Sequence, residues 1–150
     1  MTAHTHKENL FAALKHEVPD VVPWVPFAGV HAGALTGTSA RAVLTDGERL
    51  FLSLLEVNRQ YDPDGQPVMF DLQVEAEILG CDLIWDDKAP PSVVSHPLIK
   101  DAIIPQKMPE MEDGRLPMIL DTMRRMKAEV GDTTALYGLT TGPLTLASHL

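Results

Sequence analysis

Two long stretches of the chain repeat apolar residues at helical spacing. Residues 46–60 place most of their apolar side chains on one face of a helix, and residues 45–48 just before it have capping-box spacing. Residues 116–130 have the same 3.6-residue period and end at Gly131. The pattern predicts three shorter helices, at residues 5–17, 74–79 and 144–150.

Short apolar runs bounded by turn residues lie between these helices and predict strands. They cover residues 21–27, 67–70, 81–85 and 135–140. The segments 90–97 and 105–117 are rich in proline and predict extended, irregular chain. Strands that alternate with helices favour a parallel sheet with crossover connections, so the fold class is α/β.

This predicted sheet is incomplete. A parallel sheet is normally covered on both faces, and its edges are protected. Four strands followed by a helix that stops at Leu150 leave at least one edge bare. We therefore expect the 150 residues to be part of a larger domain.

The composition excludes several classes of protein. The net charge is −9 and the basic residues form no long run, which argues against a nucleic-acid partner. No apolar run reaches the roughly 18 to 20 residues that span a bilayer, and the polar N-terminus is unlike a signal peptide. We expect no membrane partner and a cytoplasmic location. Cys81 is the single cysteine, which excludes an internal disulfide and fits a reducing compartment.

Three segments, in this order, carry a resemblance to a known family. Residues 20–29 read DVVPWVPFAG, residues 70–80 read FDLQVEAEILG with an aspartate at a strand end, and residues 142–148 read GPLTLAS. Together they resemble the uroporphyrinogen decarboxylase superfamily, whose members are (β/α)₈ TIM barrels. The resemblance implies that residues 1–150 are the N-terminal part of one barrel domain, with about four of its strands, truncated at the C-terminal end.

Two departures distinguish the chain from the decarboxylases of that superfamily. The decarboxylases follow their first strand with Arg-Gln-Ala-Gly-Arg, whose arginines hold substrate carboxylates, whereas residues 26–30 here read PFAGV. A substrate with many carboxylates needs such partners. The decarboxylases also carry a tyrosine at the position of His149. By contrast, the run Val-Glu-Ala-Glu at 74–77 resembles the zinc-dependent methyltransferases, which transfer a methyl group from a corrinoid to a thiol or a related carrier.

Asp71 is the candidate catalytic residue. A carboxylate after a buried strand of a barrel is energetically unfavourable unless it binds a polar group. In the decarboxylases the resemblance implies binding to pyrrole N–H groups. In the methyltransferases it implies that Asp71 orients a substrate or a metal-bound group. The alternative is a helix N-cap aspartate.

Four more residues are candidates for substrate binding. His31 and Gly29 follow the first predicted strand, and His149 and Gly142 follow the last. Because the loops after parallel strands share one face, we expect Asp71, His31 and His149 to cluster there. The alternatives are structural histidines and a plain turn at Gly142.

For three other side chains we favour solvation or burial over a part in the reaction. Glu75 and Glu77 are two residues apart on one helix, so we expect them to point in different directions and at least one to be solvated. Cys81 is expected to be a small buried hydrophobe.

Three functions fit these residues. The first is a zinc-dependent methyltransferase with a corrinoid as possible methyl donor, a small-molecule substrate and a corrinoid protein as possible partner. The resemblance places its zinc ligands, a His-x-Cys pair and a later Cys, outside this chain, so we expect no metal ligands here. The second is a cofactor-free porphyrinogen decarboxylase. The third is a non-catalytic half-barrel that pairs with itself, as a possible homodimer, or with another chain. In either enzyme, we expect the 150 residues alone to be inactive.

Overall fold

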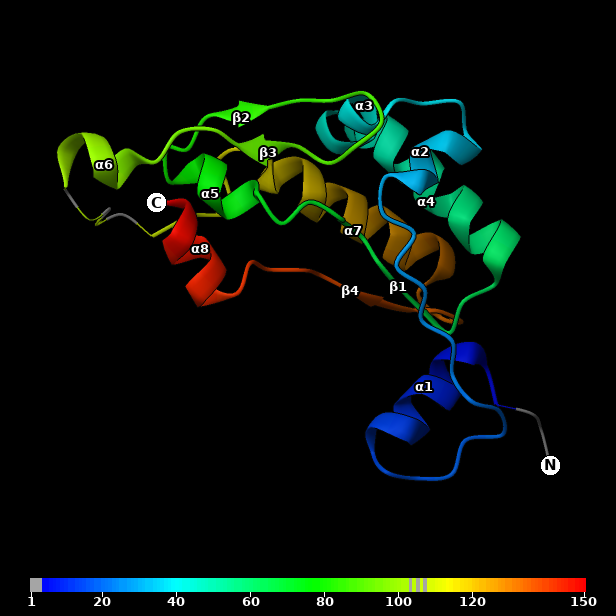
Figure 1. The fold of residues 1–150 in the computed structure, drawn as a ribbon. Coiled ribbons are helices and arrows are strands. Elements are labelled where there is room, and N and C mark those ends of the chain that lie inside the picture. The colour runs from blue at the N-terminus through cyan, green and yellow to red at the C-terminus, as the bar shows by residue number, and fades with distance from the viewer. Residues whose placement is uncertain (1–3, 103, 105, 107) are drawn as a thin grey trace.

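Eight helices and four short strands make up the described part of the computed structural model, which covers residues 4–102, 104, 106 and 108–150 (Figure 1). In chain order the elements are α1 (His6–Leu14), α2 (His31–Leu35), α3 (Ala40–Thr45), α4 (Gly47–Tyr61), β1 (Gly65–Pro67), α5 (Val74–Ile78), β2 (Leu83–Ile84), β3 (Ser92–Val93), α6 (Pro97–Asp101), α7 (Leu116–Val130), β4 (Ala135–Tyr137) and α8 (Pro143–His149).

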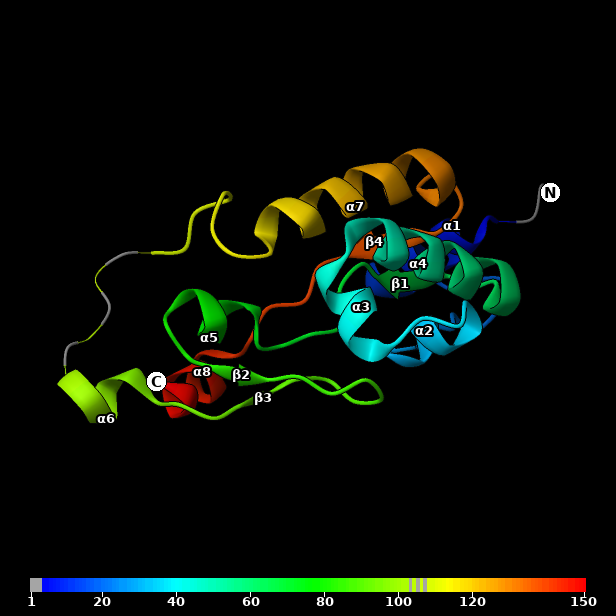
Figure 2. The same cartoon turned by 90° about the horizontal axis from the view of Figure 1, so that it is seen from above.

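The two long helices, α4 and α7, match the predicted helices and pack against each other. Asp46 is the N-cap residue of α4, and its Oδ1 accepts the backbone N–H groups of Glu48 and Arg49 at 2.9 and 3.1 Å. Viewed from above, α4 lies between α7 and the α2–α3 pair (Figure 2). The core lies among these helices and the chain that continues β1, and it contains the buried residues Ala32, Val43, Leu44, Leu50, Phe51, Leu54, Val57, Val68, Met69, Phe70, Val74 and Met126.

β1 and β4 form the parallel pair expected of two predicted strands, but β1 lies at Gly65–Pro67 rather than at residues 67–70, and β4 ends at Tyr137 rather than at residue 140. Gly65 is paired with Ala135 and Pro67 with Tyr137. The Val68 N–H then donates to the Tyr137 carbonyl at 3.0 Å, so the chain stays extended beyond β1. Both strands point away from α1 and toward α5 and α8 (Figure 1).

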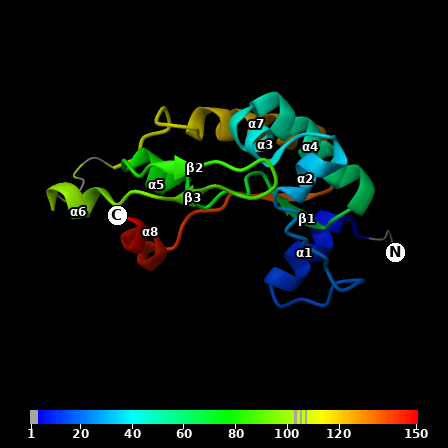
Figure 3. The same ribbon diagram turned by 45° about the horizontal axis from the view of Figure 1, so that its top comes forward.

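The prediction that residues 81–85 form a third parallel strand is wrong. β2 pairs antiparallel with β3, in a separate two-stranded sheet. The reason is the tight turn between them, where Asp86 Oδ1 accepts the N–H groups of Lys88 and Ala89 and reverses the chain. The resulting hairpin extends along the molecule from α5 toward α3 (Figure 3), and the Ala40 N–H donates to the Asp87 carbonyl at 2.8 Å.

The prediction of a strand at residues 21–27 is also wrong. This segment runs beside the start of β1, where the Asp64 N–H donates to the Trp24 carbonyl at 3.0 Å and Asp64 Oδ2 accepts the Trp24 N–H at 2.7 Å. Pro23 and Pro26 have no N–H to extend this contact into a ladder. The four-stranded parallel sheet expected from the sequence is therefore, among the described residues, a pair of strands with an extended segment beside it.

The short helices agree with the sequence only in part. α1, α5 and α8 lie where short helices were predicted, with shifted ends, whereas α2, α3 and α6 were not predicted. α2 and α3 owe their stability to packing: a Cβ on Gly33 would come within 2.6 Å of the Thr38 carbonyl oxygen and of a Val43 methyl group. In the predicted irregular stretch 105–117, residues 105 and 107 lie outside the described residues, and 116 and 117 already belong to α7.

In the part of the chain that the structure describes, we find no helix with the length and apolar character required to cross a membrane.

Candidate functional site

The two parallel strands both lead to the same end of the molecule. β1 continues through Asp71 into α5, β4 continues through Thr141 into α8, and α5 packs against α8 (Figure 1). Several charged and polar side chains meet here. We call the group of Asp71, Glu75, Glu77, Arg115 and Thr141 the strand-end cluster.

Asp71 is the most buried member of the strand-end cluster, with a side chain that is 0% exposed. Its Oδ1 accepts the Gln73 N–H at 2.8 Å, and its Oδ2 accepts a bond from Arg115 Nη2 at 2.6 Å. The N-cap residue of α5 is Gln73, so Asp71 braces the turn before the helix rather than capping it. Both carboxylate oxygens are therefore held in place by the protein.

Arg115 lies just before α7 and makes three hydrogen bonds through three different nitrogens. Nη2 binds Asp71, Nε donates to Glu77 Oε2 at 2.7 Å, and Nη1 donates to the Leu44 carbonyl at 3.1 Å. The guanidinium carbon lies 4.9 Å from the centre of the Trp85 ring, within the range of a cation–π contact. The arginine side chain is 11% exposed, so these contacts are largely shielded from water.

Glu75 binds the other side of the strand-end cluster. Its Oε1 accepts the Thr141 N–H at 3.2 Å, and its Oε2 lies 3.0 Å from the Thr141 hydroxyl, which also contacts the Leu72 carbonyl. Glu75 and Glu77 thus point toward different partners, as expected. The expectation that at least one of them is merely solvated is wrong, because each has a partner on another segment.

His149 and Gly142 lie on α8, which is at the same end of the molecule as Asp71. The His149 carbonyl accepts hydrogen bonds from His96 Nδ1 at 2.8 Å and Cys81 Sγ at 3.2 Å. Gly142 is the exposed N-cap residue of α8, and its carbonyl accepts the Leu146 N–H at 2.9 Å. These contacts hold the two ends of α8.

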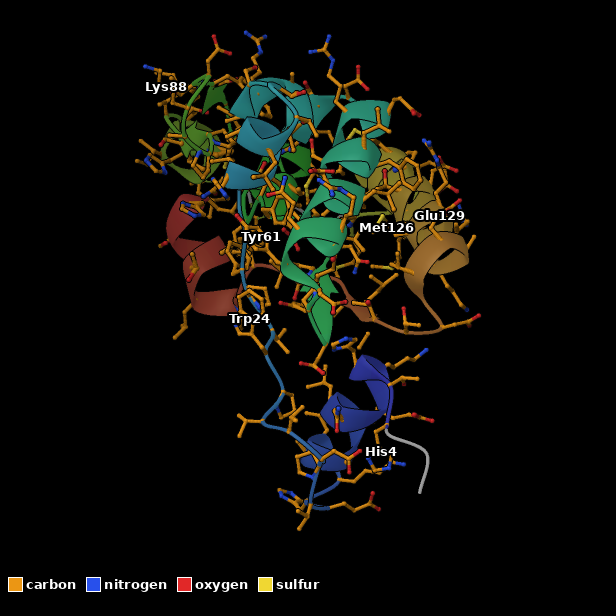
Figure 4. All side chains as sticks on the ribbon, turned by 90° about the vertical axis from the view of Figure 1, so that its right-hand side faces the viewer. His4, Trp24, Tyr61, Lys88, Met126 and Glu129 are labelled. Atoms are coloured by element: carbon orange, nitrogen blue, oxygen red, sulfur yellow. The ribbon has the colours of Figure 1, made fainter. Side chains whose placement is uncertain are left out.

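His31 is the first residue of α2 and contacts α4. Its Nε2 is 2.8 Å from the hydroxyl of Tyr61, the last residue of α4, which leads into the start of β1. The Trp24 ring contacts the Tyr61 ring edge-on, at 6.2 Å between centres (Figure 4). Gly29, with φ of +59°, turns the chain before α2. His31 is thus bound to the end of α4, whereas Asp71 is bound to Gln73 before α5 and to Arg115 before α7.

The hydrogen-bond partners of Asp71, His31 and His149 form three separate sets among the described residues. In the part of the chain that the structure describes, no hydrogen bond joins the side chains of Asp71, His31 and His149 to one another. A shared role in one site stays a prediction.

Cys81 is buried, as expected, with 5% of the residue exposed. Burial raises the pKa of its thiol, and the negative charge of Asp82 raises this pKa further. Within the described residues no group of three or more His, Cys, Asp or Glu side chains could hold a metal ion. The residues at hand therefore do not fit a zinc site.

Arg115 and Thr141 were not identified as site residues from the sequence. Arg115 lies in the proline-rich stretch 105–117, where no periodicity gives its direction, and it is 44 positions from Asp71. Thr141 directly precedes the Gly-Pro step that was read as a loop signal. Arg115 and Thr141 join the cluster by binding Glu77 and Glu75, and these contacts form only when the chain folds.

Comparison with known proteins places this arrangement in a family. The model of the family described as uroporphyrinogen decarboxylase (URO-D) matches residues 5–150, which confirms the resemblance predicted from the sequence. Methylcobamide:CoM methyltransferase MtbA of Methanosarcina acetivorans is 28% identical over 100% of this chain and 46% of its own length. A methylated-thiol–coenzyme M methyltransferase of Methanosarcina mazei is 32% identical over 54% of this chain and 22% of its own length.

A solved structure shows a similar fold. A methyltransferase from Methanosarcina mazei superposes with a TM-score of 0.83 at 28% sequence identity, over 98% of this chain and 45% of that protein. The chain thus spans about half the length of the MtbA relative and of this solved structure.

Proposed function

Because this chain belongs to the uroporphyrinogen decarboxylase (URO-D) family, we propose that the protein carrying it transfers a methyl group between a corrinoid and a thiol or related acceptor. The family and the similar methyltransferase structure imply a TIM-barrel fold, and the chain is α/β with few strands. We place residues 1–150 in the N-terminal half of one such barrel domain.

The charge of the strand-end cluster carries the choice of methyl transfer over porphyrinogen decarboxylation. Asp71 and Glu77 both bind Arg115, so its guanidinium is already matched by carboxylates. Residues 26–30, where the decarboxylases have their two arginines, contain none. A tetrapyrrole with many carboxylates would meet the carboxylates of this cluster, whose own cation, Arg115, is already paired. A thiol with a single anionic group, such as coenzyme M, or a methylated corrinoid needs fewer cationic partners than a substrate with many carboxylates.

In the proposed reaction, the acceptor thiol loses its proton and its sulfur forms a bond to the methyl carbon, while the cobalt–carbon bond of the donor breaks with both electrons left on cobalt. A zinc ion supplies a thiolate at neutral pH in such enzymes. The described residues form no site for it. The proposal therefore places any zinc ligands outside this chain.

In this proposal Asp71 orients the substrate or a metal-bound group. It does so through the oxygen lone pairs that Gln73 and Arg115 leave unused. His149 and Gly142 are proposed as nearby substrate contacts, because α8 packs on α5. Substrate binding by His31 and Gly29 stays a prediction, as do a corrinoid-protein partner, a homodimer and a cytoplasmic location.

Porphyrinogen decarboxylation is the second candidate. It is favoured by the position of Asp71 after the end of β1, where a carboxylate can bind pyrrole N–H groups without a metal. It requires that cations for the substrate carboxylates come from the rest of the protein.

The test uses the whole protein that contains this chain. Methylcobalamin is incubated with coenzyme M, the thiol named for the relatives, and the methylated thiol is measured by mass spectrometry while the cobalamin spectrum is followed. Uroporphyrinogen is assayed in parallel for carbon dioxide release. We expect methyl transfer, reduced at least about tenfold by Asp71→Asn. Decarboxylation without methyl transfer would overturn the proposal in favour of the second candidate.

A further inference from the structure

We infer that Arg115 is a positioning residue, which acts through Asp71 by fixing the direction of its carboxylate at the end of β1. The inference rests on the proposed function in one respect only, the catalytic task given to Asp71. The contacts that carry it are those of Arg115 itself, which join four segments of the chain.

The first observation is the geometry of the guanidinium. Three of its nitrogens donate to three acceptors, Asp71 Oδ2, Glu77 Oε2 and the Leu44 carbonyl. These acceptors come from the loop after β1, from α5 and from the end of α3. A lysine carries the same charge on a single nitrogen and cannot reproduce this planar fork. The arrangement is therefore specific for arginine.

The second observation is that both oxygens of the Asp71 carboxylate are hydrogen-bonded, which restricts its rotation. Its side chain is 0% exposed, and each oxygen has one donor, Gln73 N–H on Oδ1 and Arg115 Nη2 on Oδ2. Donors on both oxygens set the plane of the carboxylate as well as its direction. Without Arg115, Oδ2 would lose its donor, and a buried negative charge would lose its nearest cation.

The third observation is that Arg115 also contacts the β2–β3 hairpin. The Trp85 ring, which follows β2, lies 4.9 Å from the guanidinium carbon, so the arginine is stacked against the hairpin as well as bound to the acids. The start of α7, the hairpin and α5 all meet at this side chain. The direction of the Asp71 carboxylate therefore depends, through Arg115, on the positions of α5, the β2–β3 hairpin and the start of α7.

The chain offers a matched control in Arg125. This residue belongs to α7, the helix that Arg115 precedes; it forms an ion pair with Glu48 at 2.7 Å and lies over an aromatic ring, Phe51, at 3.8 Å. Its side chain is 35% exposed, and it has no contact with Asp71. The substitution Arg125→Lys replaces the guanidinium of an ion pair and a ring contact in α7 but leaves the strand-end cluster intact.

The experiment compares Arg115→Lys, Arg125→Lys, Asp71→Asn and the double variant Asp71→Asn/Arg115→Lys in the whole protein, with methylcobalamin and coenzyme M as substrates. We expect Arg115→Lys to lower kcat by roughly 10- to 100-fold with KM for the thiol within about twofold of wild type. Arg125→Lys should keep kcat within about twofold. If Arg115 acts through Asp71, adding Arg115→Lys to Asp71→Asn should lower kcat by less than about twofold more.

A second readout does not depend on the reaction. Hydrogen–deuterium exchange of the peptide covering residues 71–79 should rise in Arg115→Lys and stay at the wild-type level in Arg125→Lys. Unchanged exchange in Arg115→Lys would overturn the inference, as would a wild-type kcat or effects in the double variant that multiply. If the wild-type protein transfers no methyl group, the proposed function fails, and the exchange comparison still decides whether Arg115 fixes the segment.

Discussion

Gln66 is a buried polar side chain whose partners lie on another element. Gln66 lies in β1 and is fully buried, yet its Nε2 donates to the Leu54 carbonyl and its Oε1 accepts from Asn58 Nδ2, both at 3.2 Å. Asn58 also donates to Thr134 Oγ1 at 3.0 Å. An unpaired buried amide would be unfavourable by about 1–3 kcal/mol. Gln66 therefore joins β1 to α4, and Asn58 joins α4 to the residue that precedes β4.

Cys81 provides a test at the same scale. The thiolate is the form that reacts with alkylating reagents, and both burial and the neighbouring Asp82 raise the pKa of this thiol. We expect iodoacetamide at neutral pH to modify Cys81 in the folded whole protein at least about tenfold more slowly than in urea. Mass spectrometry of the peptide that contains Cys81 measures both rates. Equal rates in the two conditions would show that the thiol is accessible.

The position of Asp71 was predictable from the sequence, but its environment was not. A buried strand followed by an acidic residue is a local pattern, readable from residues 67–71 alone. Its partner Arg115 comes from a stretch whose path is set by the β2–β3 hairpin and α7. A contact across 44 positions depends on how these elements pack, which no local pattern specifies.

Among the elements, α4 has the clearest division between a buried and an exposed face. Leu54 is 0% exposed in the core, whereas Leu52, two residues earlier on the same helix, is 49% exposed. We expect Leu54→Ala to lower the free energy of unfolding by about 2–5 kcal/mol, because it leaves a cavity in a packed core. Leu52→Ala should lower it by less than about 1 kcal/mol.

Urea denaturation of the whole protein, followed by circular dichroism, measures both effects. Equal losses of stability in the two variants would mean that α4 does not pack through the face that contains Leu54.

The elements also differ in how well the sequence predicted them. α4 and α7 each contain 15 residues, long enough to display a helical period, and both were predicted close to their observed ends. β2 has the composition of a strand, but the choice between a parallel and an antiparallel neighbour lay in the turn at residues 86–89. α2 and α3 have five and six residues, too few to show a period, and form because they pack on α4.

At the scale of the whole molecule, the extended segment 21–27 exposes an apolar surface to solvent. Val22 is 90% exposed, Trp24 51% and Phe27 55%. Further along the chain, Leu144 on α8 is 87% exposed. Single exposed apolar residues are common in folded proteins, but several close together in one segment indicate a contact surface. In the proposed barrel, this surface is covered by the rest of the protein.

The last prediction concerns residues 1–150 expressed without the rest of the protein. Within the described residues, β4 pairs with one strand, β1, and segment 21–27 forms no ladder on the other side of β1. Unpaired N–H and C=O groups beside exposed apolar side chains favour association between sheet edges. We therefore expect the isolated chain to be oligomeric, aggregated or molten, and inactive in both assays above.

Analytical ultracentrifugation at micromolar concentration and a thermal melt test this expectation. A chain that associates through its edges should sediment faster as its concentration rises, and it should lack a sharp unfolding transition. Alanine at Val22 and Phe27 together, both at exposed positions, should reduce the association if segment 21–27 contributes to it. A monodisperse monomer with a cooperative melt would instead mean that these residues close their own core, and the half-barrel assignment would then be wrong.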